Sequence, residues 1–281
     1  MNRPRPPAVA GSFYPSDPDE LGGLIDQCFN ISPLGPKGTR SSSTTLIAGM
    51  VPHAGYVYSG PCAAHFYATL DKSIQRVILL GVNHWARGHR AALSPWASWQ
   101  SPSGVISVDA ALNDFLESRV KFLTRNADAH AEEHSIEVQL PFLPWVLEDF
   151  TFLPISLAHL DLDECAELGS AIAAACQEEF ACGHKTIVLA SSDLSHYLSP
   201  RVTEELDHLA LERVLALDAA GLLKVVDEKN ITMCGVLPTA VMLYAAKVLG
   251  ATRTRLLKHC HSGDVTPMRK VVGYASVAFE L

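Results

Sequence analysis

From Leu46 onward, short continuous apolar runs alternate with longer segments in which apolar residues recur every three to four positions. Short apolar runs are typical of strands buried on both faces, and the wider spacing is typical of helices with one buried side. Strands and helices that alternate along a chain favour a parallel sheet covered by helices on both faces. The predicted strands are Leu46–Val51, Val77–Val82, Thr151–Leu157, Thr186–Ser191 and Val271–Phe279, and the predicted helices are Gly60–Leu70, Asp109–Ser118, Ser135–Phe150, Asp163–Phe180, Pro200–Leu217 and Val236–Leu249.

The segment ahead of the first predicted strand divides into a helix and a loop. We expect a helix over Pro18–Phe29 that Ser16 caps, because Asp19 and Glu20 then lie in the first turn, where the helix dipole favours negative charge. Residues 32–45 are rich in Ser, Gly, Pro and Thr and predict a flexible loop. This loop lies too close to the start of the chain to separate two domains.

The overall pattern therefore predicts one domain over residues 1–281. Pro95 and Pro102 suggest that Ala91–Val108 contributes edge strands or a hairpin, because proline cannot donate to a sheet ladder. The expected fold class is α/β, with a single core and a mixed, mostly parallel sheet that has helices on both faces.

Composition narrows the choice of function classes. The chain has 281 residues, of which 48% are hydrophobic and 19% charged, as in a packed globular protein. The formal net charge is -8 and the basic residues are scattered, so nucleic acid is not an expected partner.

Neither membrane insertion nor export is expected from the sequence. The late apolar stretch from Val236 to Gly250 contains Pro238 and Lys247 and is shorter than the roughly 20 residues that a membrane helix needs. Residues 1–15 are interrupted by prolines and glycine and contain no apolar leader core. The seven cysteines are dispersed and include no CxxC pair, which suits a reduced compartment. We therefore expect a cytoplasmic protein without a membrane partner.

Histidines follow three of the predicted strands. His53 comes after the first strand, His84 after the second and His196 shortly after the fourth. Ligands of open α/β sheets bind beyond the carboxyl ends of the strands, so these three side chains would meet in one crevice if their strands are neighbours. Imidazoles grouped with a thiolate or carboxylate suit iron, copper or zinc. A capping or turn role is the structural alternative for each histidine.

Two further residues have the chemistry of a site but also have ordinary explanations. Asp193 precedes His196 by three positions, so its carboxylate can orient that imidazole or cap a helix. Cys234 stands just before a predicted helix, where the dipole and a metal would lower the pKa of its thiol, although most cysteines are buried and inert. His259, Cys260 and His261 form another local group, which we regard as pocket-wall candidates at most.

One motif suggests a different reaction. His130, Glu133 and His134 fit H-x-x-E-H, the inverted zinc-peptidase signature, which requires both histidines on one face of a helix. The segment from Asn126 to Glu133 is instead expected to be a loop, which disfavours the peptidase and leaves His134 as a residue at the edge of the crevice. The sequence contains no GxGxxG after a strand, no GxxxxGK[ST] loop and no GxSxG elbow, so dinucleotide, P-loop and serine-hydrolase readings are excluded.

Six ordered blocks along almost the whole chain resemble the MEMO family, whose bacterial and archaeal members are named AmmeMemoRadiSam system protein B. The blocks are Val9–Pro15, His53-Ala54-Gly55-Tyr56, Asn83-His84, Glu133-His134-Ser135-Ile136-Glu137, Ser191–His196 and Cys234-Gly235. The resemblance implies a fold similar to class III extradiol (LigB-type) dioxygenases. It also implies AMMECR-like and radical-SAM proteins as partners.

The resemblance further implies roles for individual residues. It places His53, His84 and Cys234 as metal ligands, with Cys234 where the dioxygenases have a carboxylate. His196 falls near their acid/base histidine with Asp193 beside it, while His134, Tyr56 and Asn83 are expected either behind the ligands, where they support them, or around the substrate pocket. Iron is the expected cofactor, with copper or zinc as alternatives, because a thiolate shifts the preference toward softer ions.

Three functions therefore stay open at the sequence level. The first is a metal-dependent oxidoreductase of dioxygenase type, acting on an unidentified small molecule. The second is a binding protein that holds metal or a peptide without turnover, and the third is a metal-free hydrolase with Cys234 as nucleophile.

Overall fold

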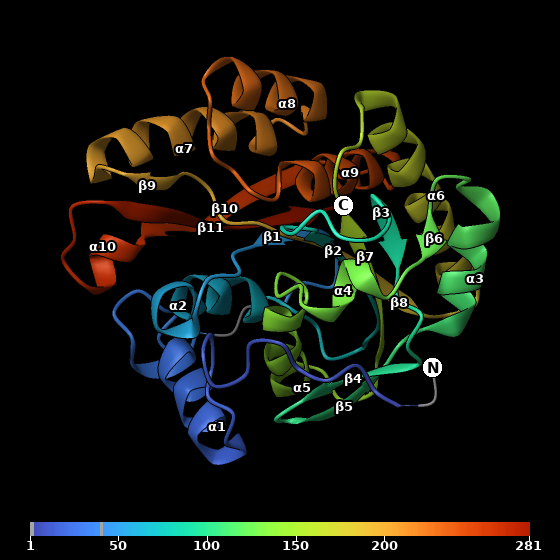
Figure 1. Cartoon of the computed structure of the whole chain (residues 1–281), viewed down its shortest axis with the longest axis horizontal. Coiled ribbons are helices and arrows are strands. Elements are labelled where there is room, and N and C mark those ends of the chain that lie inside the picture. The colour runs from blue at the N-terminus through green and yellow to red at the C-terminus, as the bar shows by residue number, and fades with distance from the viewer. Residues whose placement is uncertain (1–2, 40–41) are drawn as a thin grey trace.

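The computed structural model describes residues 3–39 and 42–281, and it has a mixed α/β fold built on a nine-stranded sheet (Figure 1). Four strands form the parallel centre in the order β1, β8, β2, β7. Their bounds are Leu46–Val51 for β1, Lys185–Ser191 for β8, Ile74–Val82 for β2 and Thr151–Leu157 for β7. These are the four central strands that the apolar runs predicted.

Antiparallel strands extend the sheet on both sides of this centre. β11 pairs with β1, with β10 and with the short β9, while β3 pairs antiparallel with β7 and parallel with β6 at the other edge. A separate hairpin, β4 and β5, lies where Pro95 and Pro102 suggested one. The bounds are β3 Ala91–Leu93, β4 Ser98–Ser101, β5 Gly104–Ser107, β6 Thr124–Arg125, β9 His196–Leu198, β10 Arg253–His261 and β11 Val271–Glu280.

Helices cover both faces of the sheet, as the alternating pattern predicted (Figure 1). Alternate residues of the central strands point to opposite faces, so Met50 and Leu80 belong to one apolar cluster whereas Val51 and Leu79 belong to the other. The first cluster packs under α3 Ala110–Arg119, α6 Leu162–Ala181, α7 Pro200–Leu215, α8 Ala219–Glu228 and α9 Val236–Val248, and the second under α1 Pro18–Asp26, η1 Gln27–Ile31, α2 Tyr56–Tyr67, η2 Glu137–Phe142 and α5 Leu143–Val146.

Two predicted helices need correction. The cap of α1 is Asp17 instead of Ser16, because the Asp17 carboxylate accepts hydrogen bonds from the backbone N–H groups of Asp19 and Glu20. The long helix predicted over Ser135–Phe150 is wrong, since this stretch forms the 3₁₀ helix η2 and the single turn α5. Its prolines, Pro141 and Pro144, remove backbone donors that a continuous helix would use.

The remaining short helices are α4 Asp128–Ala131 and α10 Ser262–Val265. The loop predicted over residues 32–45 contains no helix or strand in its described parts, residues 32–39 and 42–45, and residues 40 and 41 lie outside the described residues. In the described part of the chain, every helix is too short or too polar to cross a bilayer.

Candidate metal centre

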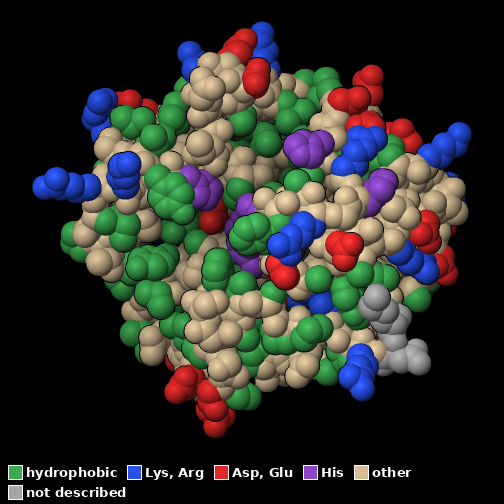
Figure 2. Space-filling model, in the orientation of Figure 1, with side chains coloured by type: hydrophobic (Ala, Val, Ile, Leu, Met, Phe, Trp, Pro, Cys, Tyr) green, Lys and Arg blue, Asp and Glu red, His purple; other side chains and the backbone are tan. Residues whose placement is uncertain are grey.

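The carboxyl ends of β1, β2 and β8 open onto one cavity, as expected for neighbouring parallel strands. Its volume is about 460 Å³. The space-filling view shows histidine side chains gathered near the middle of this face, around a hollow (Figure 2). The lining residues are Phe13, His53, Ala54, Gly55, His84, His134, Asp193, His196, Tyr197, Thr232, Cys234 and Val272.

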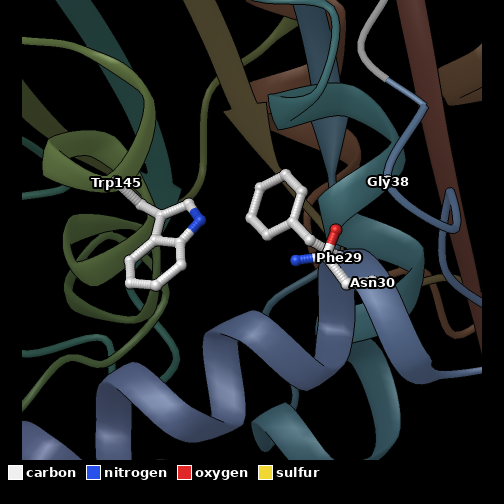
Figure 3. A pocket seen from close by; sticks show the side chains of 4 residues that line it. All are labelled: Phe29, Asn30, Gly38 and Trp145. Atoms are coloured by element: carbon white, nitrogen blue, oxygen red, sulfur yellow. The ribbon is translucent and has the colours of Figure 1, made fainter.

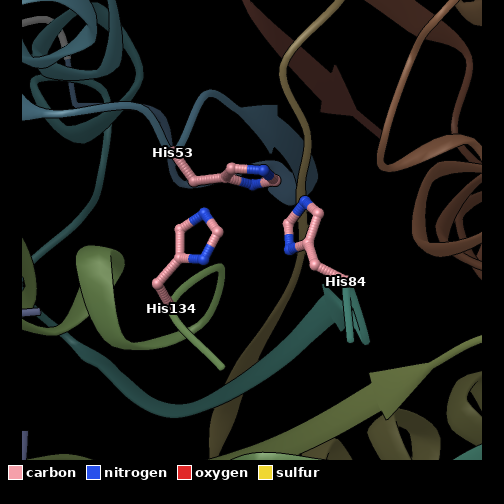
Figure 4. Close-up of side chains that lie close together, drawn as sticks. All are labelled: His53, His84 and His134. Carbon is pink, nitrogen blue, oxygen red and sulfur yellow. The ribbon is translucent and has the colours of Figure 1, made fainter. Parts of the chain in front are cut away.

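Three imidazoles in this cavity have the geometry of a metal site. One ring nitrogen from each of His53, His84 and His134 lies within 4.8 Å of the other two. The three rings turn toward a common space although they come from separate loops (Figure 4). His53 is buried, His134 is partly buried, and His84 lies at the solvent side of the group. This group of three can hold a metal ion.

Hydrogen bonds fix the tautomer of His53 so that Nε2 is free to act as a ligand. The Ser191 hydroxyl donates to the Ser135 carbonyl at 2.6 Å and accepts from Gln139 Nε2 at 2.8 Å. Because its hydrogen is already used, Ser191 Oγ can only accept from His53 Nδ1, which lies 2.9 Å away. His53 therefore carries its proton on Nδ1 and exposes the lone pair of Nε2 to the cavity.

Glu133 has the same effect on His84. The His84 Nδ1–H donates to Glu133 Oε1 at 2.9 Å, which leaves Nε2 as the free nitrogen. The same carboxylate accepts from the backbone N–H groups of His84, His134 and Ser135. The buried carboxylate of Glu133 therefore fixes the loops of His84 and His134 relative to each other.

Electrostatics keep the group ready for a cation. Burial, followed by the neighbouring His84, lowers the pKa of His53 to about 3, and burial with the charge of His53 lowers the pKa of His134 to about 4. Burial alone would raise the pKa of Glu133, but hydrogen bonding to His84 and its charge lower that pKa to about 2. At neutral pH His53 and His134 are therefore neutral, and Glu133 is a carboxylate anion.

Cys234 stands beside this group rather than among its most closely spaced members. Its Sγ lies 3.1 Å from His53 Nε2, a separation that two ligands of one ion can have. Burial, together with the charge of Asp193, raises the pKa of the Cys234 thiol. Without a metal, the thiol donates to His53 Nε2, which is the free nitrogen of that ring. Its role as a ligand stays a prediction.

His196 faces the cavity, but Asp193 does not orient it through a hydrogen bond as expected. The His196 Nδ1–H donates to the Thr232 carbonyl at 2.8 Å, and the Thr232 hydroxyl accepts from the His196 backbone N–H at 2.7 Å. Asp193 is buried and accepts instead from the backbone N–H of His53 at 2.8 Å. Asp193 therefore fixes the His53 loop, and Thr232 fixes the His196 tautomer.

Of the two positions expected for Tyr56 and Asn83, behind the ligands or around the pocket, neither residue takes the second, because neither lines the cavity. Tyr56 is fully buried in the core, where its hydroxyl donates to the Val138 carbonyl and its ring packs against Phe142. Asn83 closes a short turn, because its side-chain amide donates to the Arg87 carbonyl and accepts from the Arg87 backbone N–H. Both support the loops of the site without lining the cavity.

The remaining histidine motifs do not add to the centre. His130 is buried, and its Nε2 lies 3.0 Å from the Ala92 carbonyl, so His130 and His134 do not form the paired ligands of a peptidase. On β10, His259 pairs with Asp207 and His261 with Asp264, and neither lines the cavity.

The sequence did not predict the buried ion pair between Arg5 and Glu137, which supports the loop that carries His134. Arg5 and Glu137 are both buried and lie 2.6 Å apart. Arg5 also donates to the carbonyls of His130 and Glu133, and Glu137 accepts from the Tyr14 hydroxyl and from two backbone N–H groups of the N-terminal segment. Glu137 ends one of the six blocks and Arg5 precedes the first of them by several residues, and nothing in the sequence indicates that the two charged side chains are buried together.

A second cavity, of about 380 Å³, lies between η1 and α5 (Figure 3). Phe29 and Trp145 face it from opposite sides, with Asn30 and Gly38 at its edge. Asn30 is already paired with Asp26 at 2.6 Å. No acid, histidine or cysteine is among the described residues that line it, so this cavity has no evident chemistry.

Comparison with known proteins gives a consistent result. A family model described as Memo-like protein matches residues 5–278. A MEMO1 family protein of Methanopyrus kandleri is 41% identical, over 98% of this chain and 98% of its own length. MEMO1 family proteins of Methanosarcina barkeri and Methanocaldococcus jannaschii are 39% and 38% identical, over 98% and 100% of this chain and all of their own lengths.

Proposed function

Because this chain belongs to the Memo family, we propose that it binds a transition metal between His53, His84 and His134 and uses it as an oxidoreductase. In this proposal the protein is related in fold and chemistry to class III extradiol dioxygenases. The observation that carries it is the convergence of three imidazoles, two of which have their Nε2 lone pairs fixed toward the cavity by Ser191 and Glu133.

The donor set fits a transition metal. Neutral imidazoles bind iron, copper and zinc, whereas magnesium and calcium prefer oxygen ligands. We favour iron because it is the metal of the dioxygenases that the sequence blocks resemble. Cys234 is proposed as an additional ligand, since its sulfur lies next to His53 Nε2.

The protein would supply positioning and proton transfer. A bound redox-active ion supplies electron transfer to or from a substrate or oxygen. His196 carries its proton on Nδ1, so its Nε2 can accept a proton from a substrate hydroxyl in the cavity. Asp193 holds the loop of His53, which keeps that ligand in place as the proton moves.

A second function is favoured by the thiol beside the imidazoles. Cysteine selects soft ions such as Cu(I), so the same site can sequester copper without turnover. The two functions differ in their dependence on His196, which proton transfer requires and metal storage does not.

Metal analysis of protein purified without oxygen tests the proposal. We expect about one iron per chain, and loss of most of it in His84→Ala. His208→Ala is the matched control, because His208 is 75% exposed on α7 and belongs to a surface pair. Equal metal content in the two variants would contradict the proposed centre.

Oxygen consumption by the iron-loaded protein tests the oxidoreductase step. We expect turnover with a suitable reductant or substrate to fall by a factor of about 100 or more in His196→Ala, with metal content unchanged. A loaded protein that never reacts with oxygen or any reductant would instead favour sequestration.

A further inference from the structure

Tyr197 has an unusual backbone conformation at the edge of the cavity. Its φ is +59°, in the left-handed region that non-glycine residues seldom adopt. Its side chain lines the cavity and yet remains 69% exposed. Such a conformation persists only where the surrounding structure imposes it, and the exposed side chain of Tyr197 does not do so by packing in the core.

The surrounding strands impose this conformation. His196 and Leu198, on either side of Tyr197, both pair with β11, and the His196 backbone N–H also donates to Thr232. With both neighbours fixed, the chain turns the aromatic ring of Tyr197 toward the cavity, beside the His196 ring at a centroid distance of 5.8 Å. The strain therefore results in an exposed aromatic surface next to the proposed proton acceptor.

The rest of the cavity wall indicates what such a surface would contact. Phe13 lies on the wall, packed against His134 at a centroid distance of 4.7 Å, and Val272 adds an aliphatic group. Among the described lining residues none is Lys or Arg, and the only acid is Asp193. The wall thus offers apolar contact and no cation to pair with an anionic group.

We propose that Tyr197 is a specificity-determining residue, which packs against an uncharged apolar group on the ligand of the metal centre. This inference rests on the proposed metal function and adds the ligand class. A ligand of this class has a metal-binding head and an uncharged apolar tail that contacts Tyr197 within the cavity that Phe13 and Val272 also line.

Hydroxamates bound to the zinc-loaded protein test the proposal, because they share one metal-binding head and differ only in the tail. The probes are acetohydroxamate, benzohydroxamate and 4-carboxybenzohydroxamate, with dissociation constants from calorimetry. We expect wild type to bind benzohydroxamate about tenfold more tightly than either of the others. In Tyr197→Gly most of this advantage should disappear, while Tyr197→Phe, which keeps the ring, should retain it.

The strain makes a second, independent prediction. Glycine adopts a positive φ without steric strain, and this gain should exceed the entropic cost of a more flexible unfolded chain. Tyr197→Gly should therefore raise the melting temperature by about 2 °C while it weakens benzohydroxamate binding. Ala86→Gly is the matched control, because Ala86 has a φ of +48° next to His84 but does not line the cavity. It should raise the melting temperature without changing the preference for the tail.

The outcomes separate the two proposals. Zinc content is measured first, and a protein that takes up no zinc overturns both the metal function and this inference. If zinc binds but benzohydroxamate keeps its advantage in Tyr197→Gly, only the role of Tyr197 in ligand selection is overturned. A Tyr197→Gly variant that is no more stable than wild type would contradict the strain at this position.

Discussion

The imidazoles of the candidate centre depend on individual hydrogen-bond partners, and Glu133 is the most important of these. It binds His84 Nδ1 and the backbone of the His134 loop. We expect Glu133→Gln to weaken metal binding by a factor of about 10 to 100, because the amide no longer fixes the His84 ring as an anion does. Competition with a chromogenic chelator would measure this change.

Glu132→Gln is the matched control for this variant. Glu132 is the neighbouring residue, but its side chain is 62% exposed and pairs with Arg87 at the surface. Equal metal affinity of the two variants would show that Glu133 does not position the ligands.

The buried histidines also predict how stability depends on pH. Burial lowers the pKa of His53 and His130 to about 3 and that of His134 to about 4. In the unfolded chain these imidazoles take up protons below about pH 6.5, whereas in the folded metal-free protein they stay neutral. The free energy of unfolding should therefore decrease as the pH falls from 6.5 toward 4.

Urea denaturation of chelator-treated protein at several pH values would measure this decrease. Of these three histidines, only His130 lies outside the metal centre. In His130→Phe, the free energy of unfolding should depend less steeply on pH. A free energy of unfolding that stays constant over this range would argue against neutral buried histidines.

Some residue roles could be predicted from the sequence and others could not. The positions of His53 and His84 were predictable because both follow buried strands. The apolar runs show where these strands end, and the carboxyl ends of neighbouring parallel strands lie at the same edge of the sheet. The choice between the two positions expected for Tyr56 could not be made, because its place three residues after His53 does not reveal that it begins a helix and points into the core. The partners that fix each tautomer, Ser191 and Thr232, are contributed by distant segments and emerge only from the folded geometry.

At the scale of elements, the N-terminal segment contacts the loops that support the site. The Arg5 guanidinium donates to the Glu133 carbonyl, and its Cζ lies 4.1 Å from the centroid of the Trp99 ring. Arg5→Met leaves Glu137 buried without its cation, so we expect a loss of roughly 3 to 5 kcal/mol in the free energy of unfolding. Chemical denaturation at neutral pH would measure this loss.

Lys72→Met serves as the control for an ion pair of the other kind. Lys72 pairs with Glu148 at 2.7 Å, but the two side chains are 65% and 75% exposed. Its removal should change the free energy of unfolding by less than about 1 kcal/mol. Similar decreases in the free energy of unfolding in the two variants would show that burial and the surrounding hydrogen bonds add nothing to the contribution of the Arg5–Glu137 pair.

Most elements were predictable because their apolar spacing is strong, whereas the segment after His134 was not. Its apolar residues are spaced as in a helix, and all of η2 is buried. Tertiary contacts and the two prolines decide the outcome, since Gln139 turns inward to bind Ser191 and the Pro52 carbonyl. The strand β10 was not predicted, because most of its residues are polar and partly exposed, so it has no continuous apolar run.

For the whole molecule, metal binding should contribute to the stability of the fold. The three imidazoles come from loops at residues 53, 84 and 134, so they meet only in the folded chain. An ion that binds this state alone adds about 2.7 kcal/mol to the free energy of unfolding when its concentration is 100 times Kd. Thermal melts with and without chelator should differ accordingly, and in His84→Ala the two melts should coincide.

The fold class was predictable at this scale, because alternating strands and helices leave few arrangements of layers. The completion of the sheet was less evident. β11 pairs with both β1 and β10, and its residue Gly273 exchanges backbone hydrogen bonds with Leu194 and Ser195 beside His196. These pairings join residues that are far apart along the chain, and the spacing of apolar residues does not predict which distant strands pair.

The position of β11 determines when the site can form during synthesis. A ribosome releases residues in order, and β1 waits for a neighbour that is made more than 200 residues later. Until β11 leaves the exit tunnel, one edge of β1 stays open and the strand β9, which begins at His196, lacks its pairing partner. Loading of the ion would therefore be a late event, which follows the release of β11 from the ribosome.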